Sequence, residues 1–197
     1  MTNIASRGAT MGVDWEQRID FAKLRSDRLA RAQAALAGSE LGALLLFDPN
    51  NIRYVTSTHI GEWARDKNAR FALLPRTGPP ILWDFGSAAK HHQMYAPWLP
   101  PENFRGGVSP MRGAMPDETG VPDTLAGKIS HELRERGLEG EPVGIDMTDM
   151  VALAALQRAG ITTTDGSQVM LSAREIKTPQ EIDLLEQAAG IVDGVYE

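Results

Sequence analysis

Hydrophobic and polar residues follow two different periods along this chain. A spacing of three or four residues predicts helices, and these cover residues 20–38, 87–95, 123–136 and 150–159. Continuous or β-branched apolar runs predict strands, and these cover residues 43–47, 70–74, 81–85, 142–146 and 161–165, with another short strand near Phe104. The alternation, with one antiparallel hairpin, predicts an α/β fold: a mixed parallel and antiparallel sheet of about five or six strands, flanked by helices.

One segment after the first predicted strand stays ambiguous. Residues Asp48-Pro-Asn-Asn51 are typical of a turn, because Pro and Asn favour turn conformations. The next residues, 52–58, fit either a short helix or a strand. Residues 97–122 carry many Pro and Gly residues and are expected to be mostly loop.

The strongest helix signal lies at the end of the chain. Thr178 suits the N-cap, Pro179 fits the first helical position, and Glu181 completes a capping box. The residues that follow form one apolar stripe: Ile182, Leu185, Ala189, Val192 and Tyr196. Such a stripe needs a covering partner, so we expect a flexible arm over residues 1–19, an α/β domain over 20–171, and over 172–197 the start of a helix that leads into an absent domain.

Composition excludes several classes of partner and site. A net charge of −6 argues against nucleic acid, whose binding proteins present a basic face. No apolar run is long enough to span a bilayer, so no membrane partner is expected. The chain has no cysteine, which excludes disulfides, thiol catalysis and zinc–thiolate sites. This composition fits a reducing cytoplasm, where we expect the protein to act.

A search for catalytic or metal-binding motifs assigns no residue to either role. His131 lacks a second histidine at metalloprotease spacing and is expected on a solvated helix face, and the adjacent His91 and His92 are expected at the surface. The segment from Asp146 to Asp149 follows a predicted strand, where α/β proteins often place functional residues, but a helix cap explains it better. Phosphate-loop and serine-nucleophile motifs are absent from the sequence.

Three tryptophans differ in their expected roles. Trp63 lies in a polar stretch before a predicted strand, where an indole ring stacks on a ligand or packs back onto the domain; both interpretations stay open. Trp83 lies in a predicted strand and is expected in the core. Trp98 fits either environment.

Two motifs resemble those of a known family. The segment Ala43–Thr56 (ALLLFDPNNIRYVT) and the segment Ser172–Leu185 (SAREIKTPQEIDLL) are similar to sequences at the start and end of the first domain in creatinases, prolidases and Xaa-Pro aminopeptidases. The resemblance implies a creatinase N-terminal-like domain, followed by a pita-bread catalytic domain with a pair of divalent metal ions. In the family two Asp, one His and two Glu of that second domain hold the metals, and none of them maps onto this chain, so no cofactor is expected here.

The resemblance also implies roles for the domain. First domains of this family assemble homodimers and cover the active-site cleft, so the expected partners are the missing catalytic domain and a second copy. Trp63, with His59 and Arg65 beside it, is the expected substrate-adjacent contribution. Residues 6–12, 47–54 and 81–85 are more similar to the dimethylsulfoniopropionate lyase branch, which is one alternative. A stand-alone binding or regulatory module is the other, although such a module is not expected to expose an apolar stripe.

Overall fold

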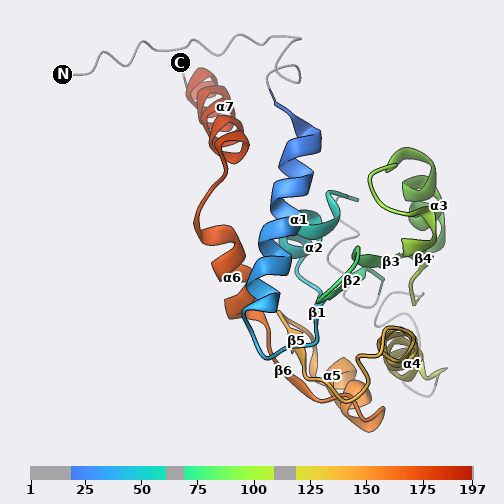
Figure 1. Ribbon diagram of the computed structural model, residues 1–197. Helices are drawn as coiled ribbons and strands as arrows, with labels where there is room; N and C mark the ends of the chain where they lie inside the picture. Colours follow the sequence, from blue (N-terminus) through green and yellow to red (C-terminus); the bar gives the residue numbers. More distant parts are fainter. Residues whose placement is uncertain (1–18, 61–68, 109–118, 197) are drawn as a thin grey trace.

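The computed structural model describes residues 19–60, 69–108 and 119–196 as an α/β domain (Figure 1). Within these ranges one six-stranded sheet has the strand order β4-β3-β2-β1-β5-β6. The strands are β1 (Ala43–Leu46), β2 (Phe71–Pro75), β3 (Ile81–Asp84), β4 (Phe104–Gly106), β5 (Val143–Ile145) and β6 (Thr163–Asp165). Strand β2 pairs antiparallel with both β1 and β3, whereas the other three pairings are parallel. The predicted mixed sheet with flanking helices is confirmed.

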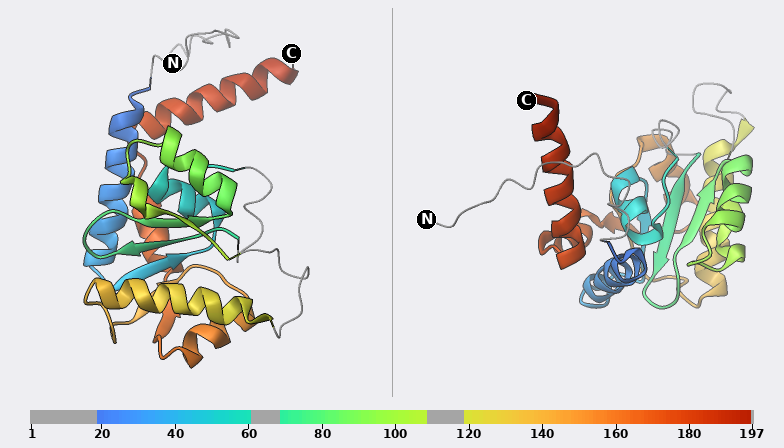
Figure 2. Two further views of the ribbon diagram at one scale, coloured as in Figure 1. Left: turned by 90° about the vertical axis from the view of Figure 1, so that its right-hand side faces the viewer. Right: turned by 90° about the horizontal axis from the view of Figure 1, so that it is seen from above.

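Helices cover both faces of this sheet (Figure 2). They are α1 (Phe21–Ala37), α2 (Pro49–Thr56), α3 (Gly86–Tyr95), α4 (Val121–Glu135), α5 (Met150–Arg158), α6 (Ser167–Glu175) and α7 (Pro179–Tyr196), with a 3-10 turn, η3, at Pro101–Asn103. Helices α1, α2 and α6 bury apolar side chains against one face, and α4 and α5 against the other. Strand β1 is buried on both sides, since Leu44 and Leu46 face the first group of helices and Ala43 and Leu45 the second.

The predicted turn at residues 48–51 is wrong, because these residues begin helix α2. Asp48 is the N-cap, and its Oδ1 accepts hydrogen bonds from the backbone N–H groups of Asn50 (2.8 Å) and Asn51 (3.0 Å). Pro49 occupies the first turn, where its missing N–H costs no helical hydrogen bond. Turns and helix N-termini use the same residue types, which explains the error. The ambiguity over residues 52–58 resolves to a helix that ends at Thr56.

Helix α6 was not predicted. It buries Met170 and Ala173, which gives a weak apolar period, and its N-cap, Gly166, makes no side-chain hydrogen bond. Tertiary contact with α1 holds it in place. The short strand predicted near Phe104 is confirmed as β4, which pairs in parallel with β3.

The capping box that begins α7 is confirmed in full. The N–H of Thr178 donates to Glu181 Oε2 (2.9 Å), and the N–H of Glu181 donates to Thr178 Oγ1 (3.1 Å). Both views in Figure 2 show α7 projecting away from the sheet and its helices. Leu185 and Val192 of the predicted stripe are 57% and 52% exposed. Among the described helices, none is both long enough and apolar enough to cross a membrane.

Candidate functional site

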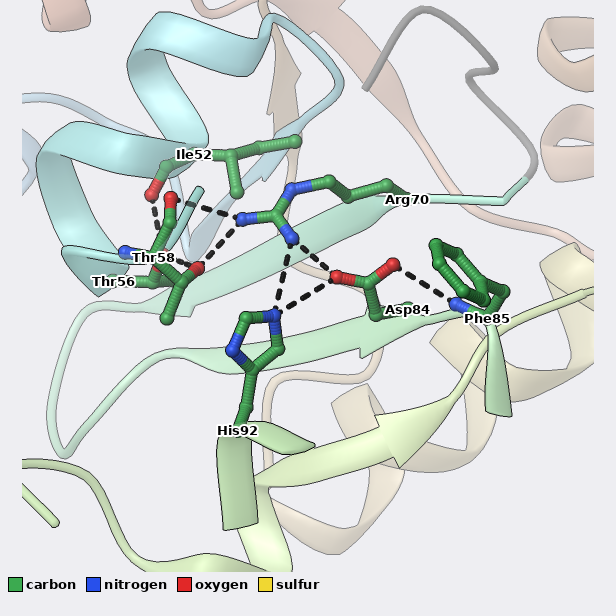
Figure 3. Close-up of polar contacts among 7 residues, drawn as sticks. All are labelled: Ile52, Thr56, Thr58, Arg70, Asp84, Phe85 and His92. Carbon is green, nitrogen blue, oxygen red and sulfur yellow. Dashed lines mark hydrogen bonds and ion pairs between the residues drawn. The ribbon is translucent and has the colours of Figure 1, made fainter. Parts of the chain in front are cut away.

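A cluster of buried polar side chains lies at one end of the β2–β3 hairpin (Figure 3). It comprises Arg70, Asp84, His92, Thr56 and Thr58, and is called the Arg70 cluster below. Arg70 directly precedes β2 and Asp84 ends β3, and the register that pairs Phe71 with Trp83 sets them opposite each other. Helix α3 supplies His92, while the threonines lie at and just after the end of α2. Four segments of the chain therefore meet at one guanidinium group.

The Arg70 guanidinium is the centre of this cluster. Its Nη1 forms an ion pair with Asp84 Oδ2, and its Nη2 donates to the backbone oxygen (3.1 Å) and to Oγ1 (2.6 Å) of Thr58. His92 Nε2 lies 3.2 Å from Asp84 Oδ2 and 3.5 Å from Arg70 Nη1. One ring nitrogen cannot donate and accept at once, and the shorter distance favours donation from Nε2–H to Asp84.

The charges of the cluster are sealed from solvent. The side chains of Arg70 and Asp84 are 1% and 0% exposed, and that of His92 is 6% exposed. Burial lowers the pKa of Arg70, because a guanidinium loses hydration there, whereas Asp84 acts in the opposite direction. Substrate cannot reach groups this deeply enclosed, so the Arg70 cluster does not itself perform catalysis. Its role is structural, because the hydrogen bonds from Arg70 to Thr58 join the two ends of the connection between α2 and β2.

That connection carries all three residues expected to lie near substrate. His59 directly follows Thr58 and is exposed. Trp63 and Arg65 lie outside the described residues, so their predicted role stays a prediction. Sequence reasoning missed the Arg70 cluster, although one signal was available: residues of opposite charge, Arg70 and Asp84, stand at matching ends of the two predicted hairpin strands.

The expected surface location of His92 is wrong. Its ring is buried against Phe104 (5.6 Å between centroids) because α3 turns this face toward β3 and β4. The neighbouring His91 is exposed, as expected, since adjacent helix positions point in different directions. The predicted exposure of His131 on α4 is confirmed.

The structure describes two other tryptophans, Trp83 and Trp98, for which the sequence predicted a core position and either environment, respectively. Trp83 is in the core as predicted, with its ring stacked on Phe71 at 5.1 Å between centroids. Trp98 is 38% exposed. Its Nε1 donates to the backbone oxygen of Thr56 (2.9 Å), and the guanidinium carbon of Arg25 lies 4.4 Å from its ring centroid. Trp98 thus joins the end of α2 to α1.

A second carboxylate, that of the half-buried Asp146, holds the carboxyl ends of two parallel strands. It accepts hydrogen bonds from the backbone N–H of Phe47 (2.8 Å), Asp48 (3.0 Å) and Met147 (2.6 Å), and from Asn51 Nδ2 (2.9 Å). Burial raises its pKa, and these hydrogen bonds offset only part of that effect. With its hydrogen-bonding capacity used internally, Asp146 is a structural tie. Asp149 caps α5 by accepting from the N–H of Ala152 (2.8 Å), which confirms the cap interpretation.

Helix α7 is joined to the domain through Glu181. While Oε2 of Glu181 completes the capping box, its Oε1 accepts from Arg28 Nε on α1 (2.8 Å). The Arg28 guanidinium carbon lies 5.4 Å from the ring centroid of Tyr54 on α2, and Tyr54 Oη donates to the backbone oxygen of Ala173 on α6 (3.0 Å). Burial acts to raise the pKa of Glu181, but hydrogen bonds from Thr178 and the Arg28 charge outweigh it and hold the pKa below its usual value.

Side chains able to hold a metal ion do not converge anywhere in the described part of the chain. There, no group of three or more His, Asp or Glu residues has the required proximity. Asp84 and Asp146 are engaged with Arg70 and with backbone N–H groups, respectively, so neither offers a free carboxylate. These residues do not fit a metal centre.

Comparisons with known proteins place this geometry in a family. The family model described as the Creatinase/Prolidase N-terminal domain matches residues 28–176. Two dimethylsulfoniopropionate lyases, both named DddP, are similar in sequence. The lyase of Roseobacter denitrificans is 29% identical over 173 residues, and that of Roseovarius nubinhibens is 27% identical over 168. These alignments cover 86% and 83% of this chain, but 38% and 36% of the lyases, so the chain spans less than half of their length.

Solved structures share the fold at low sequence identity. An Xaa-Pro dipeptidase from Bacillus anthracis superposes with a TM-score of 0.61 at 16% identity, and a prolidase from Thermococcus sibiricus with 0.59 at 23%. Each comparison covers 87% of this chain and 42% of the other. The N-terminal domain of the cytoplasmic peptidase PepQ from Mycobacterium tuberculosis gives 0.51 at 20% identity, with 76% of this chain and 99% of that one covered.

Proposed function

Because the chain belongs to the creatinase/prolidase N-terminal domain family, we propose that it is the non-catalytic N-terminal domain of a metal-dependent Xaa-Pro peptidase or creatinase-type hydrolase. Its work there is to pair two copies of the enzyme and to cover the active site. The observation that carries the proposal is that the family match ends at residue 176, and the helix beyond it exposes its apolar residues. A catalytic domain packed on α7 accounts for that exposure.

The metal ions of such an enzyme belong to the catalytic domain. Among the described residues, the carboxylates of Asp84, Glu181 and Asp146 already have internal partners. We propose that a divalent metal pair takes its ligands from the catalytic domain, and that this domain contributes position and coverage to the reaction.

Coverage of the active site is assigned to the connection between α2 and β2. We propose His59, Trp63 and Arg65 as its substrate-adjacent residues. Two facts support this assignment: His59 is exposed at the start of the connection, and hydrogen bonds from Arg70 to Thr58 join the two ends of the connection. We also propose homodimers and a cytoplasmic location, the latter because the sequence has no cysteine.

A dimethylsulfoniopropionate lyase is the second candidate for the parent enzyme. It is favoured by the two similar proteins reported above, which are both lyases named for this substrate. The two candidates share the domain's role and differ in the reaction that it covers.

The nucleotide sequence downstream of codon 197 is a direct test. An open reading frame that supplies two Asp, one His and two Glu metal ligands supports the proposal, whereas a stop codon directly after codon 197 favours a stand-alone module. The purified chain with added divalent metal is expected to turn over neither Xaa-Pro dipeptides nor dimethylsulfoniopropionate. Turnover that persists through purification contradicts a non-catalytic role.

For dimerisation, light scattering over a range of concentrations is the corresponding test. A rise from monomer to dimer mass supports the pairing of two copies. A strict monomer at high concentration contradicts it.

A further inference from the structure

We propose that Arg28 is a positioning residue: its contact with Glu181 sets the direction in which α7 leaves the α/β domain. The consequence for active-site coverage rests on the proposed function, because α7 is there the link to the catalytic domain. The contact itself is a property of this chain and is tested on this chain alone.

Few contacts other than this one hold α7. Among its described residues only Glu181 is buried. Residues farther along, including Leu185 and Val192, are more than half exposed, and the helix projects away from the sheet in both views of Figure 2. A helix held at its base and free along its length takes its direction from the contacts at the base.

One carboxylate, that of Glu181, makes two contacts at the base of α7. Glu181 Oε2 accepts from the N–H of Thr178 and fixes the first turn of α7, while Oε1 accepts from Arg28 Nε and fixes that turn against α1. The side chain of Glu181 is 7% exposed and that of Arg28 20% exposed, so water competes weakly for either group. A rotation of α7 about its base would break the contact with Arg28 and leave the capping box intact.

Arg28 is itself held in place by other residues of the domain. Its guanidinium lies over the Tyr54 ring, and the Tyr54 hydroxyl is tied to the backbone oxygen of Ala173 in the last turn of α6. Arg174 Nη1 donates to Asn51 Oδ1 (2.7 Å) at the start of α2. These contacts hold α1, α2 and α6 together and fix the position of the Arg28 side chain. Through its contact with Glu181, Arg28 then fixes the base of α7.

The lack of cysteine makes a distance measurement straightforward, since two introduced cysteines are the only labelling sites. Spin labels at Ala37→Cys, at the end of α1, and Ala188→Cys, on α7, report the direction of α7 by pulsed electron paramagnetic resonance; both positions are exposed. A second pair, Ala37→Cys with Gln157→Cys on α5, reports the α/β domain itself.

Two variants remove the contact in different ways. Glu181→Gln keeps an acceptor for the N–H of Thr178 but loses the ion pair, and Arg28→Met removes the guanidinium. We expect each to widen the Ala37–Ala188 distance distribution at least twofold and to leave the Ala37–Gln157 distribution unchanged. Arg28→Lys keeps the charge and is expected to recover part of the narrow distribution.

Lys23→Met is the matched control, because Lys23 lies on the same helix and pairs within α1 with Asp27 (2.9 Å). It is expected to leave both distributions unchanged. Narrow Ala37–Ala188 distributions in Glu181→Gln and in Arg28→Met overturn the proposal, since other contacts would then orient α7. Widening by Lys23→Met to the same extent overturns it as well. If the parent enzyme lacks the proposed activity, the proposed function is refuted. The distance distributions still test the role of Arg28, because they do not depend on that activity.

Discussion

Replacing Asp84 by Asn removes the negative charge that neutralises Arg70 and nearly preserves the shape of the side chain. The guanidinium then stays buried with no counter-charge, because its remaining partner, Thr58, is neutral. Loss of one member of a buried ion pair destabilises proteins by about 3–5 kcal/mol. In a chain of this length, 1 kcal/mol shifts Tm by roughly 2–4 °C, so we expect Tm to fall by roughly 6–20 °C.

A double-mutant cycle separates the unpaired charge from the loss of packing. Arg70→Met alone leaves the Asp84 carboxylate buried without its cation, with an expected loss of about 3–5 kcal/mol again. In the double variant Arg70→Met/Asp84→Asn no charge remains. The new amide oxygen still accepts from the N–H of Phe85, but the amide nitrogen faces His92 Nε2–H, at about 1–3 kcal/mol. The double variant is therefore expected to be more stable than either single variant, with a coupling energy of about 3–9 kcal/mol.

Urea denaturation followed by tryptophan fluorescence and by far-ultraviolet circular dichroism measures each free energy of unfolding. The exposed pair Lys23–Asp27 on α1 is the control, and its removal is expected to change stability by about 0.5 kcal/mol or less. A loss below about 1 kcal/mol in Asp84→Asn, or additive effects in the double variant, refutes the reasoning. Either result means that water solvates Arg70 in solution.

Three further predictions concern stability. Asp146→Asn is expected to lose about 2–3 kcal/mol in urea denaturation, because an amide nitrogen at the Oδ2 position would face two donors, the N–H of Asp48 and Asn51 Nδ2. Gly166→Ala is expected to lose about 1–3 kcal/mol in the same assay, since its Cβ would lie 2.7 Å from a backbone carbon of Gly144; Gly127→Ala, with open space around it, is the control and should not destabilise. The pKa of Glu181 lies below its usual value, so its carboxylate stabilises the fold above the unfolded pKa near 4.5, and that contribution disappears as pH falls through the folded pKa. Wild type and Glu181→Gln should therefore differ in free energy of unfolding at pH 7 and converge as the pH falls well below 4.5; a constant difference contradicts this assignment.

The sequence predicted those elements whose own residues determine them. The apolar run that forms β1 and the capping box of Thr178 and Glu181 are local patterns, and both were located correctly. Helix α6 escaped prediction because contacts with α1, rather than its own periodicity, hold it in place. Tertiary context of this kind overrides local propensity.

The Arg70 cluster could not be assembled from local patterns, because its members come from four segments that only the fold brings together. The cross-strand pairing of Arg70 and Asp84 could have been predicted from the predicted hairpin. The burial of His92 could not, since the sequence gives no sign of which face α3 turns toward the sheet. A similar limit applies to Arg28, which lies 153 positions from its partner Glu181.

The strand order determines which strands can pair first while this protein is synthesised on the ribosome. Strands β1 to β4 occupy four adjacent positions of the six-stranded sheet, so they emerge first and have all their mutual neighbours by residue 106. One side of β1 then stays bare until β5 emerges, which ends at residue 145. At synthesis rates of about 5–20 residues per second, that interval lasts about 2–8 seconds. During this time one edge of β1 can contact other nascent chains or chaperones. We therefore expect the translation rate between β4 and β5 to affect the yield of folded protein.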